Sequence, residues 1–383
     1  MTFSPAPIPD LLCADARVRV DVSALRQALV FAFAAGGLDE AIEQAIENAE
    51  LPESSWQKTA FERDVYLAEL VDGCFGVRIA GKPLRTSARY VTRVLAAPPS
   101  DAADVEMRRA VLAELAASAK PRQELEGACL AVVRLRALLC AARQPAPRVR
   151  RMEILRAARE AFDLLASSFE TATSGLARLR AFGAAVVRSD GYRRLAMLLE
   201  NDEHQGSLDL RVRVGADGEV RSMVIAGVHE NRDNPFYVSP IRRFLARLML
   251  MLRGYRTTEG EVVERLLSEV FGGLEEPVAM LIQLQGDIQV YLGALCFRDF
   301  ALERGLTVVL PILAPPNESL ELEGLFNPLL LGSTGAPVPC DLKIGAGATV
   351  VVTGPNSGGK TRLLQAIAIA QLLSQAGMFA PAR

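Results

Sequence analysis

Histidine is scarce in this sequence, with only His204 and His229 among 383 residues. Two histidines in unrelated contexts exclude a histidine-rich metal site and leave no Ser-His-Asp or Cys-His catalytic arrangement to argue for. The six cysteines form no CxxC pair, and a chain of this length does not need disulfides to fold. We therefore expect reduced, buried thiols in a cytoplasmic protein. The cysteines lie at positions 13, 74, 129, 140, 296 and 340.

Excess charge is also absent, because the formal net charge is −2. Only five of the 43 basic residues are lysine, so the protein is rich in arginine. Without an overall positive charge, any contact with DNA must come from a local patch. The first twenty residues carry Asp10 and Asp15 and lack the basic and apolar regions of a signal peptide. Residues 363–382 are uncharged over 20 positions, long enough to cross a membrane, but their glutamines favour a buried helix. We predict no membrane partner.

The sequence does contain a complete phosphate-binding loop of the Walker A form GxxxxGK[ST]. Residues 354–361 read G-P-N-S-G-G-K-T. Such a loop needs a strand before it and a helix after it. Residues 349–353 (T-V-V-V-T) predict a short parallel strand buried on both faces. From Leu363 onward apolar residues recur at helical spacing until Gly377, with Pro381 beyond it. We therefore predict the beginning of a P-loop α/β domain.

Each position of the loop has a predicted role in binding ATP and Mg²⁺. Its glycines permit positive φ and close approach, so the N–H groups of residues 356–360 can converge on phosphate oxygens. The N-terminus of the following helix adds partial positive charge. Lys360 is the predicted cation for the β- and γ-phosphates, and Thr361 the predicted Mg²⁺ ligand. The predicted nucleotide-binding residues of the loop are Gly354, Pro355, Asn356, Ser357, Gly358, Gly359, Lys360 and Thr361.

Further similarities extend over about residues 276–383. T-G-P-N-S-G-G-K-T is followed by Q-A-G-M-F-A-P-A at residues 375–382. V-P-C-D-L lies at residues 338–342, and L-F-N-P-L-L at residues 325–330. Together these elements resemble the MutS ATPase family of DNA mismatch repair and related proteins. Its members carry TGPNxGGK[ST], a G-x-F-x-P-A-like exit, V-P-N-D-I and G-x-H-P-hydrophobic elements. Residues 287–311 are similar to the family's long lever helix and the strand after it.

The resemblance implies partners and site residues. It implies that Phe326 and Asn327 contact adenine, that duplex or branched DNA is a partner, and that a homodimer forms through the ATPase domain. Ser357 and Arg362 depart from the family's usual Met and Thr, and no Phe-x-Glu wedge stands in a mismatch-reading context; the nearest string is at residues 61–63. We therefore expect a divergent member without an evident mismatch-reading domain.

Hydrolysis needs a Walker B acid on a second apolar strand after the loop. No such strand follows before Arg383. We therefore expect a protein truncated after the Walker A helix, naturally or otherwise. ATPase activity would belong to the complete protein, and this chain alone should not hydrolyse ATP.

Three regions are predicted, in a fold that is mainly α with a C-terminal α/β portion. Residues 1–100 are mixed and mainly helical, with a break at Gly36-Gly37 and a short strand at 77–79. Residues 101–305 form a helical core and lever domain, and residues 306–383 the incomplete N-terminal part of the ATPase domain. Helical patterns span 101–188, 239–254, 257–271 and 276–305, and a strand is predicted within 306–316.

A β-hairpin is predicted near residues 207–228, because the sequence alternates about a glycine-bearing turn. The resemblance would place such an element at or near a clamp that grips DNA. A hairpin that only braces the helices explains the pattern equally well.

A basic cluster is the second candidate binding feature. Residues 134–156 contain seven arginines and the single acid Glu153. Such a cluster can neutralise phosphates in a salt-dependent way, although a solvated helix face in an arginine-rich protein is the alternative. The predicted DNA-binding residues are Arg134, Arg136, Arg143, Arg148, Arg150 and Arg151.

These patterns predict a MutS-like, DNA-binding ATPase that couples ATP binding to DNA binding in mismatch repair or recombination. Two alternatives stay open. One is an ATP-binding subunit of another P-loop assembly, of a transporter or chromosome-organising type. The other is a helical scaffold whose loop no longer binds a ligand.

Overall fold

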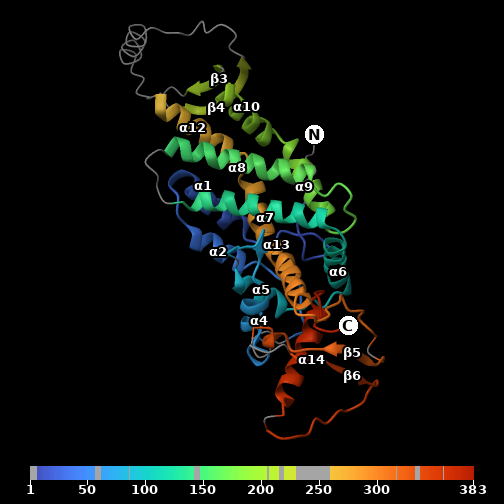
Figure 1. Cartoon of the computed structure of the whole chain (residues 1–383). Coiled ribbons are helices and arrows are strands. Elements are labelled where there is room, and N and C mark those ends of the chain that lie inside the picture. Colours follow the sequence, from blue (N-terminus) through green and yellow to red (C-terminus); the bar gives the residue numbers. More distant parts are fainter. Residues whose placement is uncertain are drawn as a thin grey trace.

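The computed structural model describes residues 7–56, 62–85, 87–141, 147–204, 207–214, 220–229, 259–315, 317–332, 337–356 and 358–383. The molecule is an elongated stack of helices with a β-hairpin at one end and the C-terminal elements at the other (Figure 1). The predicted mainly α class is confirmed, because helices dominate and the described strands form three two-stranded sheets.

The N-terminal region has the breaks that its sequence predicts. Helix α1 begins after Asp21, whose carboxylate accepts a hydrogen bond from Ala24 N, and ends at Gly36 with φ of 79°. The predicted strand near residues 77–79 is also confirmed as one arm of a minimal hairpin. The elements are α1 (Val22–Ala35), α2 (Asp39–Glu47), α4 (Leu67–Cys74), β1 (Arg78–Ile79), β2 (Lys82–Pro83) and α5 (Ala88–Leu95).

Long helices account for the next part of the chain, as predicted for residues 101–188. Asp101 and Ser118 each cap a helix N-terminus through their side chains. Pro121 is tolerated because it lies in the first turn of its helix, where backbone N–H groups have no intrahelical acceptor. The helices are α6 (Ala102–Ala117), α7 (Ala119–Cys140), α8 (Pro147–Ser167), α9 (Ala177–Val187), α10 (Asp190–His204) and α12 (Glu259–Gly272).

The predicted β-hairpin is confirmed. Strands β3 (Ser207–Val214) and β4 (Val220–His229) pair antiparallel, with Leu208 opposite Val228 and a register shift after Asp209. The hairpin stands at the end of the molecule that also carries α10 and α12 (Figure 1). The predicted helix over 239–254 lies outside the described residues.

Helix α13 (Glu275–Leu302) runs through the centre of the molecule, and every residue from 278 to 295 is buried. It is the one described helix that is long and apolar enough to cross a membrane, and its most apolar window is wholly enclosed by protein. Its glycines permit close packing. A Cβ on Gly286 would lie 2.8 Å from the Tyr90 ring, and one on Gly293 would lie 2.9 Å from the carbonyl oxygen of Phe75.

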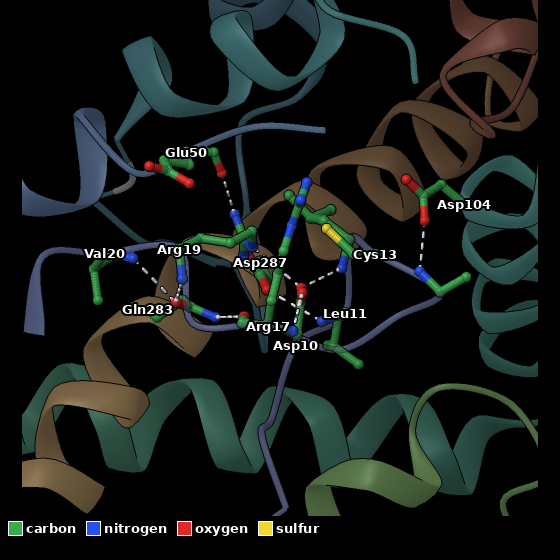
Figure 2. Close-up of polar contacts among 12 residues, drawn as sticks. Asp10, Leu11, Cys13, Arg17, Arg19, Val20, Glu50, Asp104, Gln283 and Asp287 are labelled. Carbon is green, nitrogen blue, oxygen red and sulfur yellow. Dashed lines mark hydrogen bonds and ion pairs between the residues drawn. The ribbon is translucent and has the colours of Figure 1, made fainter. Parts of the chain in front are cut away.

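Buried polar side chains of α13 bind the segment that precedes α1. Asp10, Arg19 and Asp287 point toward one another, with Gln283 beside them (Figure 2). The Arg19 guanidinium donates to Asp10 at 3.2 Å and also to Asp287, and Gln283 Oε1 accepts from Arg19 N at 2.6 Å. Burial raises the pKa of the Asp287 carboxyl against the opposing effect of Arg19. This network makes the N-terminal segment part of the core.

The cysteine prediction is confirmed in part. All six cysteines are free, and Cys13, Cys74 and Cys129 are buried. Desolvation raises the pKa of Cys13 to about 12, which keeps this sulfur protonated at neutral pH. Cys340 is exposed, contrary to expectation, because it begins a strand of a small sheet whose faces are largely open to solvent.

The C-terminal region differs most from expectation. Its regular elements are β5 (Leu320–Leu325), a 3-10 turn η1 (Pro328–Leu330), β6 (Cys340–Ile344) and α14 (Lys360–Gln375). The strand predicted within 306–316 is reduced to one bridge, Val309 with Ala380. The buried strand predicted at 349–353 is wrong. No described strand pairs with these residues, and Val351 is 79% exposed. The start of a P-loop α/β domain and its boundary near 306 therefore stay predictions.

Replacing Arg19 with Met would leave Asp10 and Asp287 buried without their shared cation. We expect the free energy of unfolding to fall by about 3–5 kcal/mol, because removing one member of a buried pair leaves uncompensated charge. Urea unfolding followed by circular dichroism measures the loss. Arg89→Met is the matched control: its side chain is 77% exposed where it pairs with Glu47. It should cost less than about 1 kcal/mol, and equal losses would contradict a structural role for the network.

Candidate nucleotide-binding site

The glycine-rich loop lies at the end of the molecule, and α14 runs from it into the helical body (Figure 1). Gly354 has φ of 142° and Gly359 has φ of 79°, conformations that favour glycine. Gly354, Pro355, Asn356, Gly358, Gly359 and Thr361 are exposed, whereas Ser357 lies outside the described residues. The Lys360 ammonium donates to the carbonyl oxygens of Gly354 at 2.6 Å and Pro355 at 2.7 Å. The loop thus curls around the ammonium at the start of the helix.

The backbone N–H groups in the first turn of α14 are available to an acceptor from outside the helix. Its N-cap is Gly359, and among the described residues no side chain caps this end of the helix. The first N–H groups of a helix have no intrahelical acceptors and carry partial positive charge, so an uncapped and exposed first turn is suited to an anion. A phosphate group fits this donor set chemically.

The opposite end of α14 is closed and buried. Met378 N donates to Leu373 O at 2.8 Å, and Gly377 N donates to Ser374 O at 3.1 Å, which is a Schellman motif around Gly377 with φ of 79°. The predicted helix and its stop at Gly377 are confirmed. Beyond it, Pro381 O accepts from Phe326 N at 3.1 Å, so the last residues lie beside β5.

Phe326 and Asn327 lie next to the first turn of α14. The Asn327 side chain donates to Arg362 O at 2.9 Å and accepts from Leu329 N at 3.0 Å. Phe326 is 1% exposed, so its ring is enclosed in this conformation. The structure brings both residues close to the loop, but an adenine contact stays a prediction. Sequence reasoning missed the Arg362–Gln365 hydrogen bond of 3.0 Å, which braces the same turn.

No group of three or more His, Cys, Asp or Glu side chains suited to a metal ion occurs among the described residues. Mg²⁺ bound with a nucleotide usually takes few protein ligands, because phosphate oxygens and water supply the rest. The exposed hydroxyl of Thr361 is compatible with that arrangement, and its role as a Mg²⁺ ligand stays a prediction.

The arginine cluster is divided between interior and surface. Arg150 is 3% exposed and donates to Ala32 O at 2.5 Å and Leu139 O at 2.8 Å, which ties the ends of α1 and α7 together. Arg136 binds Asp39 and Glu43 at 2.6 and 2.5 Å.

The structure also describes three further arginines of the predicted DNA-binding set. Arg151 donates to Ala34 O at 3.1 Å, Arg134 is exposed and bonds Glu160 at 2.6 Å, and Arg148 is exposed. Arg143 lies outside the described residues. The DNA-binding prediction is untested, and the geometry confines it to the exposed members.

Several known proteins that are similar in sequence to this chain are named Endonuclease MutS2. The chain is 54% identical over 56 residues to Endonuclease MutS2 of Gemmatimonas aurantiaca, covering 14% of this chain and 7% of that protein. It is 33% identical over 136 residues to Endonuclease MutS2 of Pelotomaculum thermopropionicum, covering 34% and 16%. Against Endonuclease MutS2 of Symbiobacterium thermophilum it is 32% identical over 172 residues, covering 43% and 20%. No family model matches the chain.

These similarities support a relationship to the MutS family. The matched segments cover a fifth or less of these three relatives' own length.

A pair of glycine substitutions tests the closed end of α14. Gly377→Ala should lower the free energy of unfolding by about 1–3 kcal/mol, since φ is positive there and a Cβ would lie 2.9 Å from Val105 O. Gly127→Ala is the matched control inside α7, where a Cβ would meet Leu164 at 3.6 Å. It should raise stability by about 0.5–1 kcal/mol. Urea midpoints that shift in the same direction would contradict the assigned geometry.

Proposed function

We propose that this chain is part of a MutS-like, cytoplasmic ATPase in which Mg·ATP binds the loop at residues 354–361 and thereby changes binding of DNA. The observation that carries the proposal is the open first turn of α14. No side chain of the described residues caps its N–H groups, its loop holds glycines in conformations that favour glycine, and Lys360 lies among them. The sequence similarity to MutS2 proteins supports the same proposal.

The predicted roles follow from this geometry. Backbone N–H groups of residues 358–361 would hold phosphate oxygens, and Lys360 would exchange its bonds to the loop carbonyls for bonds to phosphate. Thr361 would ligate Mg²⁺. ATP supplies a polyphosphate whose presence or absence changes the charge at the end of α14. A second copy of the chain would meet the loop in the proposed homodimer.

DNA binding is the other half of the proposal. The hairpin β3–β4 and the exposed arginines of the cluster are the candidate contacts, and both lie far from the loop along the chain. Structure-selective binding of branched or mismatched duplexes would assign the protein to recombination or mismatch repair.

Substituting Lys360 with Ala tests the nucleotide site. We expect the dissociation constant for Mg·ATP to rise at least about tenfold, because a charge-assisted contact with phosphate is lost. Equilibrium titration with a fluorescent ATP analogue measures it. Lys82→Ala removes the same charge from an exposed position on the β1–β2 hairpin and should leave the affinity within about twofold. A wild-type chain without affinity would instead support the scaffold alternative.

Arginine substitution tests DNA contact. We expect Arg148→Gln to weaken binding of plain, branched and mismatched duplexes alike, and to reduce the slope of log affinity against log salt by about 1. Fluorescence anisotropy over a salt series measures both quantities. Arg89→Gln, at an exposed site on α5, is the control and should leave the slope unchanged. An unaltered slope in the Arg148 variant would exclude a phosphate contact there.

A further inference from the structure

Arg108 of α6 is wholly buried and joins the two parts of the molecule that the proposed function must connect. Its Nη1 donates to Ala376 O at the end of α14 at 3.2 Å, and its Nε donates to Leu12 O at 3.1 Å. These acceptors lie far apart in the sequence. A single planar guanidinium therefore holds the helix that begins at the loop and the segment that lies along α13.

The contact with α14 is tight and electrostatically favourable. A helix C-terminus carries partial negative charge, so a cation is stabilised there. Gly377 permits the approach, since a Cβ at that position would lie 2.9 Å from Arg108 Cβ. Arg108 Nη2 has no hydrogen-bond partner among the described residues. A buried donor without a partner costs free energy, so Arg108 is not explained by stability alone.

From Leu12 the contacts continue to the centre of α13. Leu12 N donates to Asp10 Oδ1 at 2.9 Å, and Leu11 N donates to Asp287 Oδ2 at 3.2 Å. Asp10 and Asp287 are both bound to Arg19 (Figure 2). A displacement of Leu12 therefore disturbs a buried charged network on α13 directly. The path from Ala376 to Asp287 runs through hydrogen bonds at each residue.

We propose that Arg108 is a positioning residue through which nucleotide binding at the loop is transmitted to α13. The inference rests on the proposed function, because it needs a ligand at the N-terminus of α14. A helix of 16 residues behaves as a stiff rod of roughly 24 Å. Phosphate held at its first turn shifts its last turn, and Arg108 passes that shift to Leu12.

Two measurements distinguish a movement of α14 itself from the transmission of that movement to α13. Trp56 is the only tryptophan, and its Nε1 donates to Gln375 Oε1 at 2.7 Å, so its fluorescence reports the end of α14 before Arg108 is involved. Hydrogen–deuterium exchange of residues 10–20 and 283–290 reports changes in the segment before α1 and in α13, beyond Arg108. Both are recorded on the 383-residue chain with and without a magnesium-bound, non-hydrolysable ATP analogue.

The decisive variant is Arg108→Lys, which keeps the charge but cannot bridge two carbonyl groups with a planar fork. We expect it to bind the analogue within about threefold of wild type and to keep the Trp56 response, while the exchange change in residues 10–20 falls about fivefold. Arg109→Lys, at the next position, is the matched control and should transmit as wild type does. Arg108→Met should lose transmission as well.

The outcomes that would contradict this inference can be distinguished from the outcome that would contradict the proposed function. If Arg108→Lys transmits fully, the proposal is wrong. If the wild-type chain binds the analogue and residues 10–20 do not respond, the proposal is wrong whatever the variants do. Absence of binding by the wild type would overturn the proposed function itself, and this inference with it.

Discussion

A helix buried on every side cannot leave its polar side chains to water, and α13 carries several of them along its enclosed length. Asp287 accepts from Arg19 and Leu11 N, Gln283 accepts from backbone N–H groups, and Gln289 accepts from Ser87 N at 3.0 Å. Each of these partners belongs to a non-helical stretch that also needs its backbone satisfied. The helix and the irregular segments therefore stabilise one another, and neither can be placed without the other.

The same arrangement fixes where the nucleotide end of the molecule lies. After α13 ends, the Arg304 guanidinium donates to Leu331 O at 3.1 Å, and Val309 bridges to Ala380. The buried face of α14 joins the main hydrophobic core through Leu372, Leu373 and neighbours. The loop is thus exposed, but the helix behind it is packed into the main hydrophobic core. A ligand at the loop acts on a rigid element.

Local patterns were sufficient for the helices and the hairpin. Helical spacing, a glycine at the end of a helix and alternation about a turn are properties of short stretches, so α1, α14 and β3–β4 could be predicted from the sequence. The T-V-V-V-T run at 349–353 shows the limit of such reasoning. β-branched residues favour a strand, but a strand forms only beside another strand, and no described strand pairs with this run.

Arg150 shows why the site could be predicted only in part. In the sequence it is one arginine of a basic cluster, yet its guanidinium binds carbonyl groups at the ends of α1 and α7, which are about a hundred residues apart in the chain. Its burial depends on where two helices end in space. The loop motif carries its chemistry within eight consecutive residues, so it could be found without that information.

The two ends of α14 differ in how their free backbone groups are hydrogen-bonded. This difference bears on whether the loop is a ligand site or part of a scaffold. At the C-terminus the Schellman hydrogen bonds and Arg108 satisfy the carbonyl groups. At the N-terminus a glycine stands where Ser, Asp or Thr would cap the first turn, as Asp21 does for α1 and Ser118 for α7. Helices α2, α4, α9 and α13 also begin without a side-chain cap, so the missing cap alone does not separate a ligand site from a scaffold. The first turn of α14 differs because it is exposed and follows a glycine with φ of 79°. Leaving the donors of the first turn open to solvent beside Lys360 favours a site whose cap is an anion.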